Sequence, residues 1–193
     1  MSARLAFGKL RMRTELSNDV VKIRRYCADD VPLLFEAARE SVNEMFAWMC
    51  WCHPNYTVEE SRSFVVSSET AWNQKSGFEF AVFDANSDLF LGGVGLNSLN
   101  TKNNFANLGY WVRSSQTGRG IATAATLLAA KFGFEDLGLS RIEILMEIEN
   151  VASRRVAEKA GAKKEGILRN RILLHNHPFD AIMYSLIAAD MNI

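Results

Sequence analysis

A glycine turn in front of a helix is the first feature of the sequence that could do chemistry. Gly118 and Gly120 flank Arg119, and an apolar, alanine-rich run follows without another glycine until Gly133. In such a turn, main-chain N–H groups point outward together at the positive end of the helix dipole, which suits phosphate oxygens. Glycine allows close approach and arginine adds charge, although glycine also occurs in strand-to-helix turns for conformational reasons alone. The turn matches neither G-x-G-x-x-G with a following acidic residue nor G-x-x-x-x-G-K-[ST].

A second stretch, Cys50-Trp51-Cys52-His53, contains residue types that bind metals. A Cys-x-Cys-His run without a second cluster falls short of a zinc-binding set. We therefore expect no metal site. The three cysteines of the chain are an odd number, which argues against a disulfide framework.

The elements that must position these residues follow from the hydrophobic pattern. Thr57 and Glu60 form a capping-box signature at the start of one helix. We expect helices from Asp29-Asp30 to about Glu40 and over 57–74, 121–138 and 151–160, and strands over 20–24, 78–85, 89–96, 105–112, 141–148, 163–174 and 179–187. This order predicts a single α/β or α+β domain around one mixed sheet, spanning residues 20–188. Residues 1–19 are mixed in character and predict an arm or an extra strand.

Composition excludes several classes of function. The 193 residues are 48% hydrophobic, enough for one core, and carry 22 basic and 22 acidic side chains. A balanced charge provides no overall field that would recruit nucleic acid or an anionic membrane. No apolar run reaches the length of a membrane span, and the first residues lack the apolar centre of a signal peptide. The expectation is a soluble, cytoplasmic protein.

Two ordered motifs carry a resemblance to a known family. LGYWVRSSQTGRGIAT (108–123), followed by IENVASRRVAEKAGAKKEGILR (148–169), resembles the GCN5-related N-acetyltransferases, or GNAT superfamily. Within it, the chain is most similar to the ribosomal-protein N-terminal acetyltransferases of the RimJ/RimL type. The resemblance covers residues 20–188 and includes the tryptophan-rich stretch WMCW (48–51). It implies a mixed sheet of about seven strands with helices on both faces, splayed between the fourth strand (105–112) and the fifth (141–148).

The resemblance also implies where the cofactor acetyl-CoA binds. It lies in the gap between the splayed strands, where its pantetheine pairs with the main chain of Trp111, Val112 and Arg113. The family's pyrophosphate loop corresponds to Thr117, Gly118, Arg119, Gly120, Ile121, Ala122 and Thr123. At the start of the next helix, Asn150 and Ser153 lie close to the cofactor and Arg155 reaches its polar end. Helix capping is the competing interpretation of Asn150 and Ser153, and the two roles can coexist.

Three residues depart from the family pattern. Thr117 stands where glutamine or arginine is usual, which leaves the main-chain cradle intact. Ala157 stands where many members carry the tyrosine that protonates the departing thiolate. The branch carries serine at the position of Ser153, which makes Ser153 the candidate for that proton, with Asn150 beside it. Asn107 stands where related enzymes carry a glutamate that accepts the proton of the amine. Asparagine cannot take a proton, although it could hold a water or the amine.

The missing glutamate bears on which amine reacts, because only a neutral amine attacks a thioester. An α-amine with a pKa near 7.8 is roughly one-seventh neutral at pH 7, whereas a lysine near 10.4 is only about 0.04% neutral. The difference is about 3.5 kcal/mol of barrier, so a site with a weak base favours an α-amine. Glu147 is the alternative base, since it lies at the splay on the same strand face as Glu143. It could equally be an exposed strand carboxylate, and the base stays open.

These residues predict an acetyltransferase that works by direct attack of a primary amine in a ternary complex. Trp48, Trp51, Asn107 and Tyr110 are the expected acceptor-binding residues, with core packing as the other interpretation of the tryptophans. A main-chain N–H near Trp111–Val112 would meet the oxyanion. The favoured acceptor is the N-terminal α-amine of a protein. A small-molecule amine is the rival, and a non-catalytic acyl-CoA-binding sensor is the alternative from a different class. Either a monomer or a homodimer fits the sequence.

Overall fold

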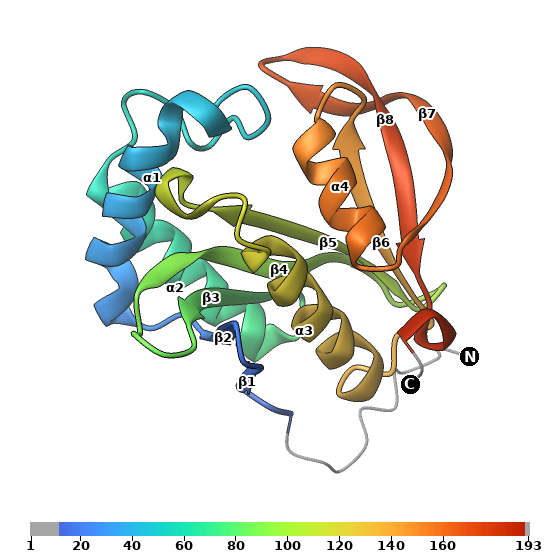
Figure 1. Cartoon of the computed structure of the whole chain (residues 1–193), viewed down its shortest axis with the longest axis horizontal. Helices are drawn as coiled ribbons and strands as arrows, with labels where there is room; N and C mark the ends of the chain where they lie inside the picture. The colour runs from blue at the N-terminus through green and yellow to red at the C-terminus, as the bar shows by residue number, and fades with distance from the viewer. Residues whose placement is uncertain (1–11, 192–193) are drawn as a thin grey trace.

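An eight-stranded mixed sheet runs through the computed structural model, which describes residues 12–191 (Figure 1). The strand order is β1-β2-β3-β4-β5-β6-β8-β7. The strands are β1 (Glu15–Ser17), β2 (Val21–Arg25), β3 (Phe78–Asp84), β4 (Phe90–Asn100), β5 (Phe105–Val112), β6 (Arg141–Glu147), β7 (Lys163–Leu174) and β8 (His177–Leu186). The α-helices are α1 (Val31–Met45), α2 (Val58–Gln74), α3 (Ile121–Glu135) and α4 (Val151–Lys159).

The predicted fold class is confirmed, with one strand more than expected. The additional strand, β1, pairs antiparallel with β2 at the edge of the sheet. It comes from the segment predicted as an arm or extra strand, of which residues 1–11 lie outside the described residues. The predicted capping box is also present, because Thr57 Oγ1 accepts from Glu60 N at 3.3 Å and Glu60 Oε2 accepts from Thr57 N at 2.8 Å.

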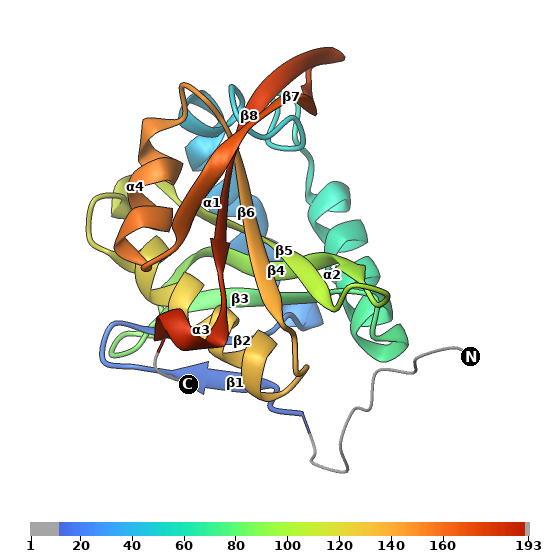
Figure 2. The ribbon, with the colours of Figure 1, turned by 90° about the vertical axis from the view of Figure 1, so that its right-hand side faces the viewer.

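The splay between β5 and β6 is the feature that makes a site possible. These parallel strands pair over only three residues, from Phe105↔Arg141 to Asn107↔Glu143. Beyond that point β5 stays with β4 as far as Val112, whereas β6 stays with β8 as far as Glu147 (Figure 2). One edge of β5 is therefore left without a strand partner from Leu108 onward. The predicted splay is confirmed.

Helices cover both faces of the sheet because alternate strand residues bury opposite faces. The α1–α2 face packs residues such as Ala81, Phe83 and Phe90 against Leu34 and Val65. The other face packs its own apolar residues against α3, and α4 lies beside α3 over β6. In Figure 1, α3 lies in front of the sheet and α2 behind it. Among the described residues, no helix is both long and apolar enough to cross a membrane.

Candidate active site

A cavity of about 480 Å³ lies between the open edge of β5, the start of α3 and the start of α4. We name it the donor cavity, after the acetyl donor that the sequence predicts there. Most of the residues predicted to contact acetyl-CoA line it: Trp111, Val112, Thr117, Gly118, Gly120, Ile121, Ala122, Thr123, Asn150, Ser153 and Arg155. Two do not, Arg113 and Arg119. Sequence reasoning missed Gln116 and Lys159, which also line it.

The glycine turn gives this cavity its polar end. Gly118 and Gly120 have φ values of 78° and 79°, in the left-handed region that favours glycine. A Cβ at either position would meet no atom within 4 Å, so the backbone conformation, rather than packing, favours glycine here. The first main-chain bond of α3 runs from Ala124 N to Gly120 O at 2.9 Å. Within the described chain, the N–H groups of residues 118–123 donate to no other group. Such a row of N–H groups fits an anion like a diphosphate.

Two cationic side chains also line the donor cavity. Arg155 and Lys159 project from α4 and line it, and among residues 12–191 neither forms an ion pair. Arg119 instead turns its guanidinium to the Gln116 side chain on the exposed side of the turn. The cationic side chains that line the cavity thus come from α4, and Arg119 does not line it.

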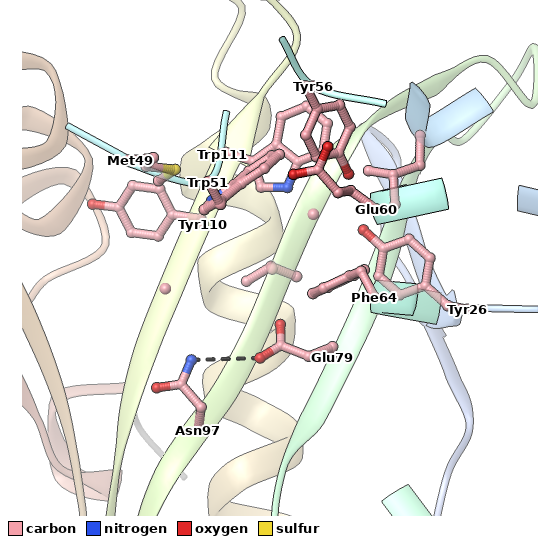
Figure 3. Close-up of a pocket in the computed structure, with 14 residues that line it drawn as sticks. Tyr26, Met49, Trp51, Tyr56, Glu60, Phe64, Glu79, Asn97, Tyr110 and Trp111 are labelled. Atoms are coloured by element: carbon pink, nitrogen blue, oxygen red, sulfur yellow. Dashed lines mark hydrogen bonds between the residues drawn. The ribbon is translucent and has the colours of Figure 1, made fainter. Parts of the chain in front are cut away.

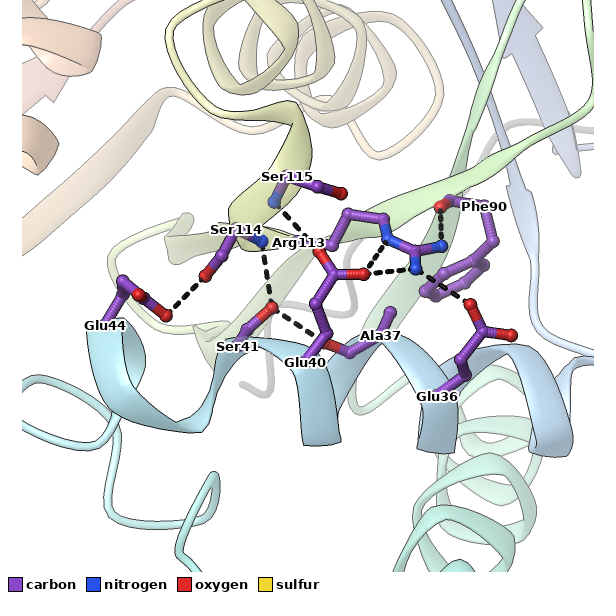
Figure 4. A network of polar contacts seen from close by, with 9 residues as sticks. All are labelled: Glu36, Ala37, Glu40, Ser41, Glu44, Phe90, Arg113, Ser114 and Ser115. Atoms are coloured by element: carbon purple, nitrogen blue, oxygen red, sulfur yellow. Dashed lines mark hydrogen bonds and ion pairs between the residues drawn. The ribbon is translucent and has the colours of Figure 1, made fainter.

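Arg113 does not line the cavity; it belongs to a network of hydrogen bonds, which we call the anchor, that ties the end of β5 to α1 (Figure 4). Its main-chain N–H donates to Leu91 O at 2.8 Å, and its carbonyl accepts from Gln116 N at 3.0 Å. The buried guanidinium donates to Glu40 through Nε at 3.0 Å, to Glu36 at 2.8 Å and to the Phe90 carbonyl at 3.3 Å. With both main-chain groups used inside the protein, Arg113 has none left to pair with a pantetheine.

The same anchor fixes the chain just before the glycine turn. Ser114 N donates to Ser41 Oγ at 3.0 Å, and Ser114 Oγ donates to Glu44 Oε2 at 2.7 Å (Figure 4). Ser115 N donates to Glu40 Oε1 at 2.8 Å. Hydrogen bonds from Arg113 and Ser115 lower the pKa of Glu40 from 4.5 to about 2. Helix α1 thus holds the turn that presents the N–H groups of α3.

Alternation along β5 decides which main-chain groups face the gap. Arg113 N donates toward β4, and a methyl group added at Gly92 on β4 would collide with the Trp111 carbonyl oxygen. The main-chain groups of Trp111 and Arg113 therefore face β4, and those of Tyr110 and Val112 face the open edge. Of the three residues predicted to pair with the donor, only Val112 presents its main chain there, and Tyr110 joins it.

A second cavity of about 400 Å³ opens on the α1–α2 face of the sheet (Figure 3). We name it the acceptor cavity, after the amine acceptor that the sequence predicts beside Trp51 and Tyr110. Aromatic side chains form its walls, and Glu79 and Asn97 stand at its polar end. It shares three residues with the donor cavity, namely Met49, Tyr110 and Trp111. Two cavities on opposite faces thus meet at the open edge of β5.

The predicted acceptor residues divide between these spaces. Trp51 and Tyr110 line the acceptor cavity, whereas Trp48 lines the donor cavity. Asn107 lines neither, but its Nδ2 donates to Asn97 Oδ1 at 3.0 Å, and Asn97 Nδ2 donates to Glu79 Oε1 at 3.4 Å. Sequence reasoning missed Glu79. Its one signal was a carboxylate inside the otherwise apolar strand FEFAVF.

Ser153 and Tyr110 form a hydroxyl pair beside the donor cavity. The Tyr110 hydroxyl donates to the Ser153 carbonyl at 2.9 Å, and its oxygen lies 3.0 Å from Ser153 Oγ. Burial raises the pKa of Tyr110 to about 12, so the phenol keeps its proton at neutral pH. Asn150 caps α4, with Oδ1 accepting from Ser153 N at 3.0 Å. Asn150 and Ser153 thus take part in the helix cap and also line the donor cavity.

Glu147, the alternative base, lies on the other side of the splay. Its Oε2 accepts from Glu149 N at 2.6 Å, and it lines a third cavity of about 450 Å³ between β5 and β6 together with Asn150 and Ser153. It does not line the acceptor cavity. Glu147 and Glu79 thus line different cavities.

Comparison with known proteins assigns the family. Residues 21–163 match the model of the acetyltransferase (GNAT) domain. "Probable N-acetyltransferase YjcK" of Bacillus subtilis is 34% identical over 125 residues, 62% of this chain and 67% of that protein. "Putative ribosomal N-acetyltransferase YdaF" of the same organism is 26% identical over 174 residues, 88% of this chain and 92% of that protein.

A solved structure shows the same fold. RimL, the ribosomal L7/L12 α-N-protein acetyltransferase in complex with coenzyme A, superposes with a TM-score of 0.81 at 20% identity, covering 91% of this chain and 97% of its own. The splayed sheet and the family match agree. The chain therefore belongs to the GNAT family of N-acetyltransferases, whose acetyl donor is acetyl-CoA.

Proposed function

We propose that this protein transfers the acetyl group of acetyl-CoA to the N-terminal α-amine of a protein, by direct attack in a ternary complex. The observation that carries the proposal is the meeting of the donor and acceptor cavities at Tyr110 and Trp111, on the open edge of β5. A thioester held along that edge faces an amine that enters from the α1–α2 side. No covalent intermediate on the enzyme is required by this arrangement.

The donor cavity supports the first half of the proposal. The unpartnered N–H groups of residues 118–123 hold the diphosphate at the start of α3, with Arg155 and Lys159 beside it. The main chain of Tyr110 and Val112 pairs with the pantetheine like an added strand. Tyr110 N–H, on the open edge where the two cavities meet, is the group that meets negative charge on the thioester oxygen, because the main chain of Trp111 faces β4. Ser153, supported by the Tyr110 hydroxyl, returns a proton to the departing thiolate.

The preference for an α-amine rests on amine chemistry and on relatives. An α-amine is several hundredfold more often neutral than a lysine at pH 7, by roughly 2.6 pKa units. YdaF carries the name of a ribosomal N-acetyltransferase, and RimL is described as an α-N-protein acetyltransferase of ribosomal L7/L12. A cavity of about 400 Å³ accepts the end of an extended chain and not a folded surface. The same volume also suits a small free amine, which is the second candidate.

A thiol-release assay with matched acceptors tests this function. Each peptide is supplied with a free N-terminus, with a blocked N-terminus and an internal lysine, and with both amines blocked, beside free amino acids and polyamines. We expect release of coenzyme A with the free N-terminus and loss of release when only lysine is available, with mass spectrometry locating the acetyl group. Faster turnover of a small amine than of any peptide would favour the second candidate. Binding of coenzyme A by calorimetry without release on any amine would contradict catalysis and favour a sensor.

A further inference from the structure

We propose that Glu79 binds the ammonium group of the acceptor and takes its proton, supplying from β3 the carboxylate that position 107 lacks. This inference rests on the proposed function and identifies the base within it. Four observations carry the inference: the glycines between Glu79 and the open edge of β5, the aromatic walls of the acceptor cavity, an unpartnered hydroxyl, and the hydrogen bonds that connect Glu79 to Asn107.

Between Glu79 and the open edge of β5, the surface of the sheet carries glycines, which place no side chain in the space above it. Glu79 pairs with Gly95 on β4, and Gly95 pairs with Gly109 on β5, so the three residues form one row across the sheet. A methyl group added at Gly95 would collide with the Glu79 carboxylate, which therefore lies directly over that glycine. One strand spacing of about 4.8 Å then separates the carboxylate from Gly109. An amine nitrogen between them contacts both the carboxylate and the edge where the thioester lies.

The walls of the acceptor cavity suit a cation. Tyr26, Trp51, Tyr56, Phe64 and Trp111 surround the space in front of Glu79 (Figure 3). Aromatic faces attract ammonium groups, and no lysine or arginine lines this cavity within the described residues.

The other ionisable groups of the wall leave Glu79 as the available carboxylate. They are three tyrosines (Tyr26, Tyr56 and Tyr110) and Glu60. Glu60 is occupied by its capping box with Thr57 and by His53 Nε2 at 2.8 Å.

An unpartnered hydroxyl points to a bound ligand. Tyr26 is 5% exposed, and its hydroxyl oxygen has no hydrogen-bond partner among the described residues. The oxygen lies 2.7 Å from the position of a Cβ added at Gly93, over the floor of the acceptor cavity. An ammonium group has three N–H donors, of which Glu79 and Tyr26 can accept two. A bound acceptor amine would therefore satisfy a polar group that the protein alone leaves unsatisfied.

The connection through Asn97 links the base to the position where related enzymes carry it. Asn107 donates to Asn97, which donates to Glu79, so the three polar side chains form one chain across β5, β4 and β3. Burial raises the pKa of Glu79 above its ordinary value of 4.5, with the Asn97 bond acting in the opposite direction. A carboxylate of raised pKa is a better proton acceptor at neutral pH than an exposed one.

Atoms, electrons and protons balance in this step. Glu79 takes one proton from the ammonium and passes it to solvent at the mouth of the cavity. The neutral amine then attacks with its lone pair, so a C–N bond forms and the C–S bond breaks with its electron pair on sulfur. Amide formation releases a second proton from nitrogen, which Glu79 also takes and passes to solvent. The Ser153 hydroxyl gives its proton to the thiolate and regains one from solvent. The products are the acetylated amine, the free thiol and one proton in solution.

The test compares Glu79→Gln with Glu69→Gln, a matched loss of one carboxylate on the exposed surface of α2. We expect Glu79→Gln to lower kcat/KM for the amine about 100-fold, while the Kd for coenzyme A stays within twofold of wild type. The limb of the pH–rate profile that reports a carboxylate base should disappear in Glu79→Gln alone. Glu69→Gln should match wild type in every measurement.

Three results would overturn the assignment of Glu79. They are turnover by Glu79→Gln within threefold of wild type, an unchanged pH profile, or loss of the carboxylate limb in Glu147→Gln but not in Glu79→Gln. Calorimetry of a peptide with a free N-terminus, added to enzyme saturated with coenzyme A, gives a readout independent of turnover. If the wild type turns over no amine, the proposed function fails, whereas peptide binding that depends on Glu79 still supports the ammonium site. Equal peptide binding by wild type and Glu79→Gln contradicts it.

Discussion

Replacing Glu40 by glutamine should destabilise the protein in a pH-dependent way. Glu40 joins α1 to the chain before the glycine turn, because it accepts from both Arg113 and Ser115 N. The guanidinium it neutralises is buried, so removal of the carboxylate charge leaves a cation with poorer compensation. Glutamine keeps the size of the side chain and leaves one oxygen acceptor for the two donors.

The magnitude follows from the pKa of Glu40. A carboxyl group whose pKa falls from 4.5 to about 2 on folding contributes about 3.4 kcal/mol at neutral pH. Because the side chain is 29% exposed, solvent screening reduces this to about 2 kcal/mol. In a chain of 193 residues, a loss of about 2 kcal/mol lowers Tm by about 4–8 °C. The pKa is depressed in the folded state, so the contribution is complete above about pH 4.5 and disappears as the pH falls through about 2.

Urea unfolding of wild type, Glu40→Gln and Glu36→Gln at pH 7 and pH 3 measures this contribution. Glu36 binds the same guanidinium but is 67% exposed, so its replacement should cost about 0.5 kcal/mol or less. The difference in free energy of unfolding between wild type and Glu40→Gln should be larger at pH 7 than at pH 3. Equal losses in the two variants, or a difference that does not change with pH, would refute the reasoning.

Three further predictions concern the cavities. Gly120→Ala and Gly138→Ala place the same methyl group at φ values of 79° and 65° in open space, so each should cost about 1–2 kcal/mol in urea unfolding. Calorimetry should show that only Gly120→Ala weakens coenzyme A binding, about tenfold, and equal effects would contradict the phosphate site. Ser153→Ala should lower kcat about 100-fold with little change in KM for the amine, and a rise in KM alone would argue against proton transfer. Glu79→Gln should raise Tm relative to wild type more at pH 8 than at pH 5, because a raised carboxyl pKa costs the folded state stability as pH rises above about 4.5. A Tm difference independent of pH would contradict the burial of that charge.

Local signals in the sequence predicted most of the fold. The capping box at Thr57 marked the start of α2, and alternation marked β5 with the bounds that the structure shows, Phe105–Val112. β1 has only three residues, too few for a periodic pattern, and its identity as a strand depends on pairing with β2. Elements marked by a local sequence pattern, such as α2 and β5, could be predicted. β1 forms by pairing with β2, so the sequence left its segment open between an arm and a strand.

Long-range contacts explain where the site prediction needed change. Arg113 follows the cofactor strand in sequence, but its partners Glu36 and Glu40 lie on a helix more than 70 positions earlier. Trp48 and Trp51 are three residues apart, yet they face different cavities. The position of Glu79 over Gly95 depends on the register between β3 and β4, which no local pattern specifies.

The three residues shared by the two cavities also determine how the reactants can be joined. Among the described residues, Met49, Tyr110 and Trp111 are the ones that line both cavities. In the proposed function, the donor and the amine therefore occupy separate cavities that meet at these three side chains. A single compound that joins a coenzyme A fragment to an amine-bearing fragment would run past these three side chains and occupy both cavities. The connection would raise the effective concentration of the second fragment, making such bisubstrate compounds the natural inhibitors of this enzyme.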